Sequence, residues 1–324
     1  MKQKSILYSC LALMLLSSCH LFHQEEQVTA KPDLTIGYFP SSDMLPYYLA
    51  LQQGYFDSLQ VRPVFRRLES KLQCDTLYRT GTLDGCIFDL TDALRMSAQG
   101  NPIHPVMANE GCFYLIGTPD STVTDYTQIK DKTIAVTSYA ASDFLADRLI
   151  AQIGLTGDDV NKPQIGDEYT RLEMLLNGQI DAGVFREPYA TQAIRKKAIK
   201  LYAFRDMNMP TTVTAFSPTT LDKKTDAIRK LIQGYNRAVK YMNSHPVRSW
   251  YREVADSIGF PHWNAPIRIA PFQEARPIPK AVADSTAKWM KRHELIPDSY
   301  IGDIIDRSVL DSVPTDTTST HYQP

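Results

Sequence analysis

The middle of the chain carries a pattern of helix, turn, buried strand and second helix. Apolar positions recur at helical spacing over 169–176, and Gly178 supplies a left-handed residue that ends such a helix. The segment 180–185 is short and apolar, which predicts a strand buried on both faces. Pro188 suits the first position of a new helix, because its fixed φ fits there. Basic residues at 195–197 then close that helix with the charge its dipole prefers.

The same pattern occurs earlier in the chain. Residues 81–93 match 178–190, 97 residues later, with Gly81, Asp84 and Phe88 in the places of Gly178, Asp181 and Phe185. A second pair, 34–38 and 132–136, repeats at nearly that spacing as a strand, a polar loop and a helix. Short strand–Gly–Asp patterns also arise by chance, but two matched pairs favour a duplicated α/β unit. Two such units predict two lobes, with a cleft at the carboxyl ends of their strands.

The remaining pattern predicts mixed sheets flanked by helices. Further strands are expected at 61–65, 103–108, 112–118, 164–166, 199–204 and 211–217, and further helices at 45–52, 72–79, 91–99 and 145–153. After Pro218 the pattern turns helical, with helices expected at 228–242, 247–258, 282–289 and 301–305, around a Pro-rich segment at 261–279. The end of the chain, 311–324, is rich in Thr, Asp and Pro and is expected to be disordered.

Length and charge narrow the class of protein. The chain has 324 residues, enough for two domains with good cores. Its 35 Lys and Arg nearly balance its 36 Asp and Glu, for a net charge of −1, and no basic stripe is present. Neither feature indicates a nucleic-acid partner.

The N-terminus predicts export and a lipid anchor. Lys2 and Lys4 precede an apolar run, 6–16, that is too short to span a bilayer. Leu-Ser-Ser-Cys at 16–19 then resembles a lipobox, which would make residues 1–18 a signal peptide, Cys19 the lipidated residue and 19–32 a flexible tether. The alternative is a plain signal peptide with an incidental cysteine. The polar stretch after Cys19 and the lack of an A-x-A-like site favour lipidation to a bacterial membrane, although which membrane is open.

Three further cysteines remain in the body of the chain. Cys74, Cys86 and Cys112 form no C-x-x-C motif, so no metal site is predicted. Cys86 and Cys112 fall in apolar segments and are expected to pack as small buried hydrophobes. A disulfide between two of the three is left open, since exported proteins form them.

Candidate ligand-binding residues follow the predicted strands at four corners. They are Tyr38, Ser41 and Asp43; Asp89 and Thr91; Ser138, Ala141 and Ser142; and Arg186 with Glu187. Structural roles compete with binding, because Ser138, Ser142 or Asp89 would cap a helix in any case. Glu187 is better placed to support its corner than to touch a ligand. Asp84 and Asp181 start their strands, so turn hydrogen bonds are expected of them.

No catalytic constellation emerges. The sequence has no G-x-S-x-G elbow and no phosphate-binding Gly loop, and its seven histidines do not pair at metal-ligand spacing. No catalytic residue and no cofactor is therefore predicted.

Several of these segments together resemble a known family. Ile-Gly-Tyr at 36–38, Tyr-Leu-Ala-Leu-Gln-Gln-Gly-Tyr-Phe at 48–56, Gly-Gln-Ile-Asp-Ala at 178–182, Glu-Pro-Tyr-Ala at 187–190 and the ending at 305–310 are similar to SsuA/THI5-like periplasmic binding proteins. That family serves nitrate, sulfonate, taurine and thiamine-precursor transport. The Cys-rich motif of its fungal pyrimidine synthases is missing here.

The resemblance implies a type II periplasmic binding protein fold with a hinged cleft. Lobe one would combine 33–115 with 216–310, and lobe two would be 116–215. The protein would be a monomeric solute-binding lipoprotein that closes over a small molecule and delivers it to an ABC permease. The alternative is an enzyme of cofactor-precursor metabolism on the same scaffold.

The chemistry of the solute stays open at this point. Arg186 and the helix-start amides favour an anionic group on the solute, whereas Asp43 and Asp89 favour hydrogen-bond donors or a cation. A pyrimidine-like precursor is among the solutes that the family resemblance implies.

Overall fold

The structure is a computed structural model that describes residues 31–119, 122–260, 271–301 and 303–314. Its contacts separate Met1–Pro32 from Asp33–Pro324, and only the second unit is considered below. The predicted signal peptide, Cys19 and most of the tether therefore lie outside the described residues, as does 315–324.

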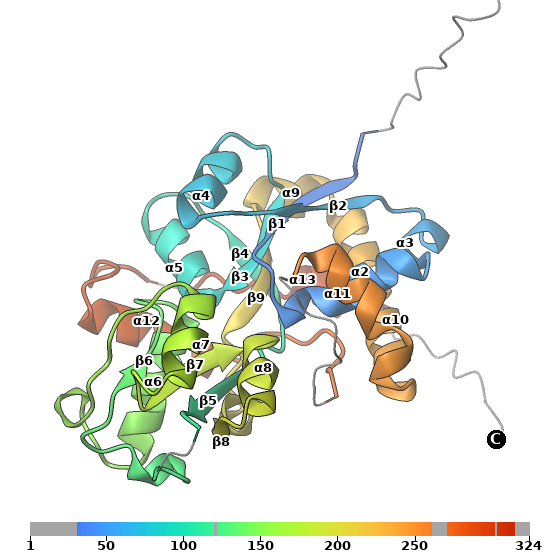
Figure 1. Cartoon of the computed structure of the whole chain (residues 1–324). Coiled ribbons are helices and arrows are strands. Elements are labelled where there is room, and N and C mark those ends of the chain that lie inside the picture. Colours follow the sequence, from blue (N-terminus) through green and yellow to red (C-terminus); the bar gives the residue numbers. More distant parts are fainter. Residues whose placement is uncertain (1–30, 120–121, 261–270, 302, 315–324) are drawn as a thin grey trace, which may run out of the picture. The chain divides into compact units, whose positions relative to one another are not determined.

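The unit contains two sheets (Figure 1). The five-stranded first sheet has the order β2-β1-β3-β9-β4, from β1 (Leu34–Tyr38), β2 (Pro63–Arg67), β3 (Gly85–Asp89), β4 (His104–Ala108) and β9 (Thr212–Phe216). The four-stranded second sheet has the order β6-β7-β5-β8, from β5 (Phe113–Gly117), β6 (Ile134–Ala135), β7 (Ala182–Arg186) and β8 (Ile199–Ala203). We call the first sheet with its helices lobe one and the second lobe two.

The chain passes between the sheets twice. It leaves the first sheet at 109–112 and returns to it at 204–211. The expected boundaries at 115 and 215 fall inside β5 and β9, each of which pairs along its whole length within one sheet. The boundaries between the lobes therefore lie a few residues before β5 and before β9, in the crossovers at 109–112 and 204–211, where the backbone belongs to neither sheet.

Pairing within the sheets confirms the internal repeat. β1 runs parallel to β3, and β6 runs parallel to β7. The Asp84 carboxylate accepts the Thr35 N–H at 2.8 Å, and the Asp181 carboxylate accepts the Thr133 N–H at the same distance. Residues 81–93 and 178–190 thus occupy equivalent places. The two carboxylates bind the neighbouring strand rather than their own turn.

Helices cover both sheets. Lobe one has α2 (Leu45–Gln52), α3 (Tyr55–Ser58), α4 (Lys71–Arg79), α5 (Leu90–Ala98), α9 (Pro218–Lys223), α10 (Thr225–Ser244), α11 (Tyr251–Ile258), α12 (Lys280–Arg292) and α13 (Ser308–Asp311). Lobe two has α6 (Ala141–Gln152), α7 (Glu168–Leu176) and α8 (Tyr189–Arg195). Short 3-10 turns lie at η2 (Ser42–Met44), η3 (Tyr126–Gln128), η4 (Gly157–Asp159), η5 (Phe204–Met207) and η6 (Val247–Ser249).

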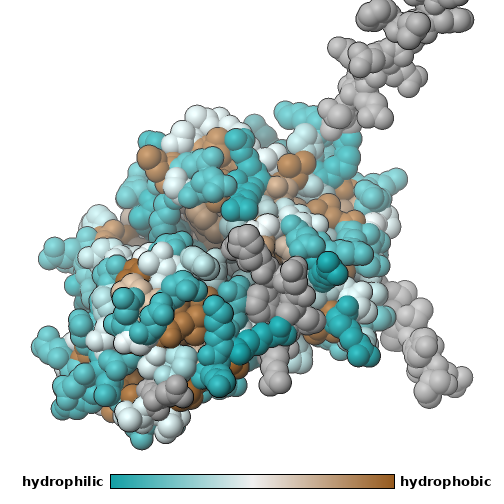
Figure 2. Space-filling view, viewed as in Figure 1, coloured by the Kyte–Doolittle hydropathy of each residue, from teal (hydrophilic) through white to brown (hydrophobic). Residues whose placement is uncertain are grey.

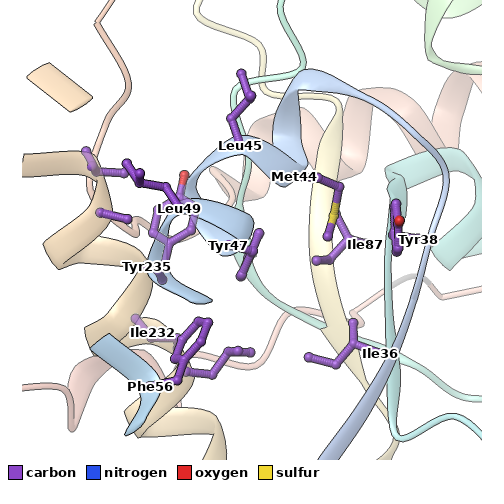
Figure 3. Packing of buried hydrophobic residues seen from close by; sticks show 14 of the residues in the cluster. Ile36, Tyr38, Met44, Leu45, Tyr47, Leu49, Phe56, Ile87, Ile232 and Tyr235 are labelled. Carbon is purple, nitrogen blue, oxygen red and sulfur yellow. The ribbon is translucent and has the colours of Figure 1, made fainter. Parts of the chain in front are cut away.

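The core of lobe one fixes α2 against the first sheet. Figure 3 shows Tyr47 of α2 beside Tyr235 of α10, and their ring centroids are 5.0 Å apart. The Tyr47 hydroxyl shares a 2.6 Å hydrogen bond with the Thr214 hydroxyl on β9. Both tyrosines are buried. The Tyr47 ring packs against an apolar neighbour while its hydroxyl keeps a hydrogen-bond partner. This packing holds the start of α2, and with it the loop that follows β1, in a fixed place.

The opposite face of the first sheet meets lobe two. Phe144 of α6 packs edge-on to Trp289 of α12, with centroids 5.5 Å apart. The Trp289 indole N–H donates to the Asp147 carboxylate at 2.8 Å. The two lobes therefore touch through an apolar contact with a polar partner.

Some expected elements are wrong. Residues 303–307 form no helix, because the Asp306 N–H donates to the Pro105 carbonyl and the chain follows β4 instead. Only α13 is helical there, and Ile301 is 89% exposed. Pro188 precedes α8 as its N-cap rather than opening it. The strand expected at 164–166 is reduced to one isolated bridge.

The three cysteines of this unit are free thiols. Cys74 and Cys86 are buried with their Sγ atoms 3.5 Å apart. Cys112 precedes β5 in the left-handed region, with φ 36°, and is half-buried. The expectation of a buried strand position is therefore wrong for Cys112 and right for Cys86.

The surface is mostly polar. Figure 2 shows apolar residues in separate patches among hydrophilic ones on the face in view. Within the described ranges, no helix has the length and apolar character needed to cross a membrane.

The paired aspartates give a test of the repeat. Asp181→Ala leaves the Thr133 N–H without its acceptor, and Asp84→Ala does the same to Thr35. Each change is expected to lower the free energy of unfolding by about 1–3 kcal/mol in urea denaturation. The exposed Asp222→Ala is the control, expected within about 0.5 kcal/mol of the parent. If Asp84→Ala and Asp181→Ala were both as stable as the control, neither carboxylate would have the stabilising role assigned to it.

Candidate ligand-binding site

A cavity of about 340 Å³ is lined by the strand ends of both lobes. Lobe one contributes from 39–43, 67–71 and 87–92. Lobe two contributes from 137–140, 166–168 and 186–189. These are the loops that follow parallel strands and open helices, where α/β sheets bind ligands.

Asp89 and Arg186 meet at the centre of this site. They end β3 and β7 at matched positions of the repeat, 97 residues apart. An Arg186 Nη2 atom lies 3.5 Å from Asp89 Oδ1. Asp89 Oδ2 accepts the N–H of Ala141 at 3.0 Å, so a lobe-one carboxylate sits on the first turn of α6. The positive end of the helix dipole stabilises that carboxylate.

Arg186 is held on its other side by lobe two. Its Nε donates to Glu168 Oε1 at 3.0 Å, and its guanidinium lies 4.8 Å from the Phe113 ring centroid. Burial works to lower the pKa of Arg186, but the charges of Asp89 and Glu168 outweigh it and raise that pKa above its ordinary value. Arg186 therefore stays charged and faces one carboxylate from each lobe.

Two of the helices that begin beside the cavity, one in each lobe, also occupy equivalent positions of the repeat. α4 begins at Lys71 and α7 at Glu168, again 97 residues apart. Their N-caps are Ser70, which accepts the Gln73 N–H, and Asp167, which accepts the Thr170 N–H. Each lobe thus places a charged residue from the first turn of a helix in the wall of the cavity: Lys71 in lobe one and Glu168 in lobe two.

Asp43 connects the cavity with the first crossover between the sheets. Its Oδ1 accepts the N–H of Gly111 at 2.8 Å, and Gly111 has a φ of +67°. Burial raises the pKa of Asp43 to about 6, and the Gly111 hydrogen bond opposes that shift. Its charge state is therefore coupled to the segment that joins the lobes.

The structure brings some of the predicted site residues together and leaves others out. Ser41, Asp43, Asp89 and Arg186 line the cavity, whereas Ala141 is not part of the lining and donates its N–H to Asp89. Tyr38, Thr91, Ser138, Ser142 and Glu187 do not line it.

Most of the residues left out have structural roles. The Tyr38 hydroxyl is 2.8 Å from that of Tyr48 within the core. Ser142 Oγ accepts the Thr137 N–H, which closes the loop before α6. Thr91 is buried at the start of α5. The Tyr38 and Ser142 side chains therefore bond within the core and within their own loop rather than line the cavity.

Glu187 supports α8. Its carboxylate accepts the N–H of Thr191 at 3.1 Å and the hydroxyl of Thr191 at 2.9 Å, and only 1% of Glu187 is exposed. Burial raises the pKa of Glu187 to about 7, although both Thr191 bonds oppose the shift.

Sequence reasoning missed several cavity residues. They include Phe39, Phe88 and Tyr189, the charged pair Lys71 and Asp92, and Glu168 with Thr212. The repeat held a signal for Lys71 and Glu168, because the same 97-residue offset joins their helices. No pattern in the chain marked the three aromatic residues as cavity walls rather than core.

The donor groups do not suggest a metal centre. Within the described part of the chain, no cluster of three or more His, Cys, Asp or Glu has the arrangement of a metal site.

Two α/β lobes with a cavity at their facing strand ends define the two-lobed fold of the periplasmic binding proteins. The NMT1/THI5-like family model matches residues 41–249, and the chain belongs to that family. No match was found among curated proteins.

Solved structures agree on the fold. The periplasmic aliphatic sulphonate-binding protein SsuA of Escherichia coli superposes with a TM-score of 0.69 at 16% identity, over 86% of this chain and 92% of its own. The periplasmic nitrate-binding protein NrtA of Synechocystis PCC 6803 has a TM-score of 0.66 at 11% identity, over 86% and 87%. The desulfurization enzyme DszB has a TM-score of 0.55 at 12% identity, over 82% and 93%. At these identities the likeness concerns the fold alone.

The raised pKa of Glu187 gives a test by pH. Its folded-state pKa, about 7, lies above the ordinary 4.5, so the folded chain holds a proton that the unfolded chain releases. The stability of the parent is therefore expected to fall as pH rises from about 5 to 8, relative to Glu187→Gln, which cannot ionise.

Urea denaturation of both proteins at pH 5, 6, 7 and 8 measures this difference. The free energy of unfolding of Glu187→Gln should be close to that of the parent at pH 5. By pH 8 it should exceed that of the parent by about 1 kcal/mol or more. A difference that does not change with pH would show that Glu187 ionises normally in the folded protein.

Proposed function

We propose that this chain is a solute-binding lipoprotein that captures a small molecule between its lobes and delivers it to an ABC permease. The observation that carries the proposal is the cavity whose walls come from both lobes, with Asp89 of one bonded to the start of α6 in the other. Family membership and the likeness to SsuA and NrtA support it.

The mechanism is closure around the solute. A solute that contacts both lobes stabilises the closed arrangement more than an open one, so binding shifts the population toward closure. The crossovers at 109–112 and 204–211 are the two segments that would bend. Gly111 and Asn208 there have positive φ, typical of chain reversals outside regular elements. The permease then recognises the closed form.

The N-terminus completes this proposal. Lipidation of Cys19 after removal of 1–18 would hold the exported protein at a bacterial membrane, with 19–32 as a tether. A monomer suffices, because both halves of the cavity come from one chain. The tether would keep the receptor within reach of its permease.

A second candidate is an enzyme on this scaffold, favoured by the likeness to DszB. Of the described residues that line the cavity, none is a cysteine or a histidine. Its aliphatic hydroxyl groups, on Ser41, Thr137 and Thr212, therefore have no imidazole among these residues to act as a base. This favours binding without turnover.

Filling the cavity tests the proposal. A Cβ at Gly166, on the cavity wall, meets nothing within 4 Å, so Gly166→Trp adds bulk without a local clash. The parent is screened by thermal shift against sulfonates, nitrate, carboxylates, amines and pyrimidines. A solute at 100-fold its Kd should stabilise the parent by about 2.7 kcal/mol. Gly166→Trp is expected to lose most of that shift.

Gly157→Trp is the matched control, since a Cβ at Gly157 also meets nothing within 4 Å and Gly157 does not line the cavity. It should bind as the parent does. Equal binding by Gly166→Trp would place the solute elsewhere, and product in the same mixtures, detected by mass spectrometry, would favour the enzyme.

A further inference from the structure

We propose that the cavity selects a small organic cation with N–H donors and an apolar or flat body, and rejects sulfonate and nitrate anions. The inference rests on the proposed function and names the class of solute. It depends on how the charged groups of the cavity wall are already paired.

The groups that would bind an anion are occupied by the protein itself. One of the helix starts beside the site, the first turn of α6, already donates its Ala141 N–H to Asp89. Arg186, the most buried cation of the wall, faces Asp89 at 3.5 Å and Glu168 at 3.0 Å. A carboxylate of this chain therefore stands where an anionic solute would find its charge partner.

The other two cations of the wall are paired as well. Lys71 Nζ lies 2.9 Å from the Asp92 carboxylate. Arg67 Nε lies 3.4 Å from Glu69, and both side chains are largely exposed. An anion entering the cavity would share its cation with a carboxylate of this chain, and that carboxylate repels it.

Carboxylates exceed cations around the cavity. Its described lining holds six carboxylates, on Asp43, Glu69, Asp89, Asp92, Asp167 and Glu168, and three cations, on Arg67, Lys71 and Arg186. Arg95 and Arg171 stand behind Asp92 and Glu168 without lining the cavity. Carboxylates remain in the majority even when these two are included, so the local field favours a positive solute.

Two of these carboxylates have acceptor atoms to spare. Asp89 is 5% exposed, and its Oδ1 lies 3.5 Å from Arg186 Nη2 but accepts no hydrogen bond from the described residues. Glu168 Oε2 is buried and likewise accepts none from them. Buried acceptors without donors are costly, by about 1–3 kcal/mol each. Since one belongs to each lobe, a solute with N–H groups would satisfy both and join the lobes.

The walls between the charges suit a flat or apolar body. Phe39, Phe88 and Tyr189 line the cavity. Aromatic faces attract cations electrostatically and also stack on planar groups. The volume of about 340 Å³ corresponds to about ten non-hydrogen atoms at about 30 Å³ each. A protonated amine or an amidinium on a small ring fits both limits.

Paired probes of opposite charge test the inference on the full-length chain. Benzamidine and benzenesulfonate share a ring but differ in charge, and propylamine and propanesulfonate form an alkyl pair. Isothermal titration is expected to show binding of the cation in each pair, at least tenfold tighter than the anion, with nitrate not binding.

Variants then separate a charge preference from simple packing. Asp89→Asn keeps the size of the side chain but frees Arg186 and the start of α6 from a negative charge. It is expected to weaken benzamidine binding at least tenfold and to create benzenesulfonate binding. Glu168→Gln should shift the preference between cation and anion in the same direction. It replaces Asp89→Asn as the test variant if Asp89→Asn fails to fold. Asp284→Asn, an exposed change on α12, should bind as the parent.

The outcomes distinguish this inference from the proposed function. Tighter binding of either sulfonate or of nitrate by the parent overturns the cation assignment and leaves solute binding intact. No binding of any of the four probes at 20 mM also contradicts the assignment, while the wider solute screen still decides on solute binding. Unchanged charge preference in both variants removes Asp89 and Glu168 from the basis of selectivity.

Discussion

The contact between Asp89 and Arg186 is the constraint on which the site depends. These residues end equivalent strands of two repeated units, and the pairing of those units across the cavity brings a carboxylate of one against a guanidinium of the other. Asp89 also accepts a hydrogen bond from the Ala141 N–H. One buried side chain at the end of β3 therefore contacts both the end of β7 and the start of α6 in the other lobe. Few other side chains in the described chain join the lobes so directly.

Duplication of the unit explains why the site has the form it does. Each lobe has a strand, a corner and a helix start, and the copies are 97 residues apart in the sequence. Each residue position at the cavity in one lobe therefore has an equivalent position in the other. The two copies have diverged in charge: Asp89 stands opposite Arg186, and Lys71 has Glu168 as its counterpart. Two like charges at the positions of Asp89 and Arg186 would repel across the cavity. Opposite charges instead hold the lobes together and neutralise the cation that an anionic solute would need.

The sequence predicted most of the fold because its signals are local. Gly178, the apolar run before Arg186 and the matching run before Asp89 fix a turn and a buried strand within a dozen residues. The strand-end rule also pointed to Ser41, Asp43, Asp89 and Arg186, which line the cavity. It also pointed to Glu187 and Ser142, which bond within their own loops and do not line the cavity. The helix expected at 301–305 is wrong, because contact with β4 overrides helical spacing there. The aromatic walls could not be predicted, since a Phe on a strand looks the same whether a helix or a cavity covers it.

The most direct test of this account is an experimental structure of the protein with its tightest-binding solute. We expect the solute in the cavity, with donor groups within about 3 Å of Asp89 in lobe one and Glu168 in lobe two. A solute bound to one lobe alone, or at a site away from these two carboxylates, would contradict closure of twin α/β units over a small molecule.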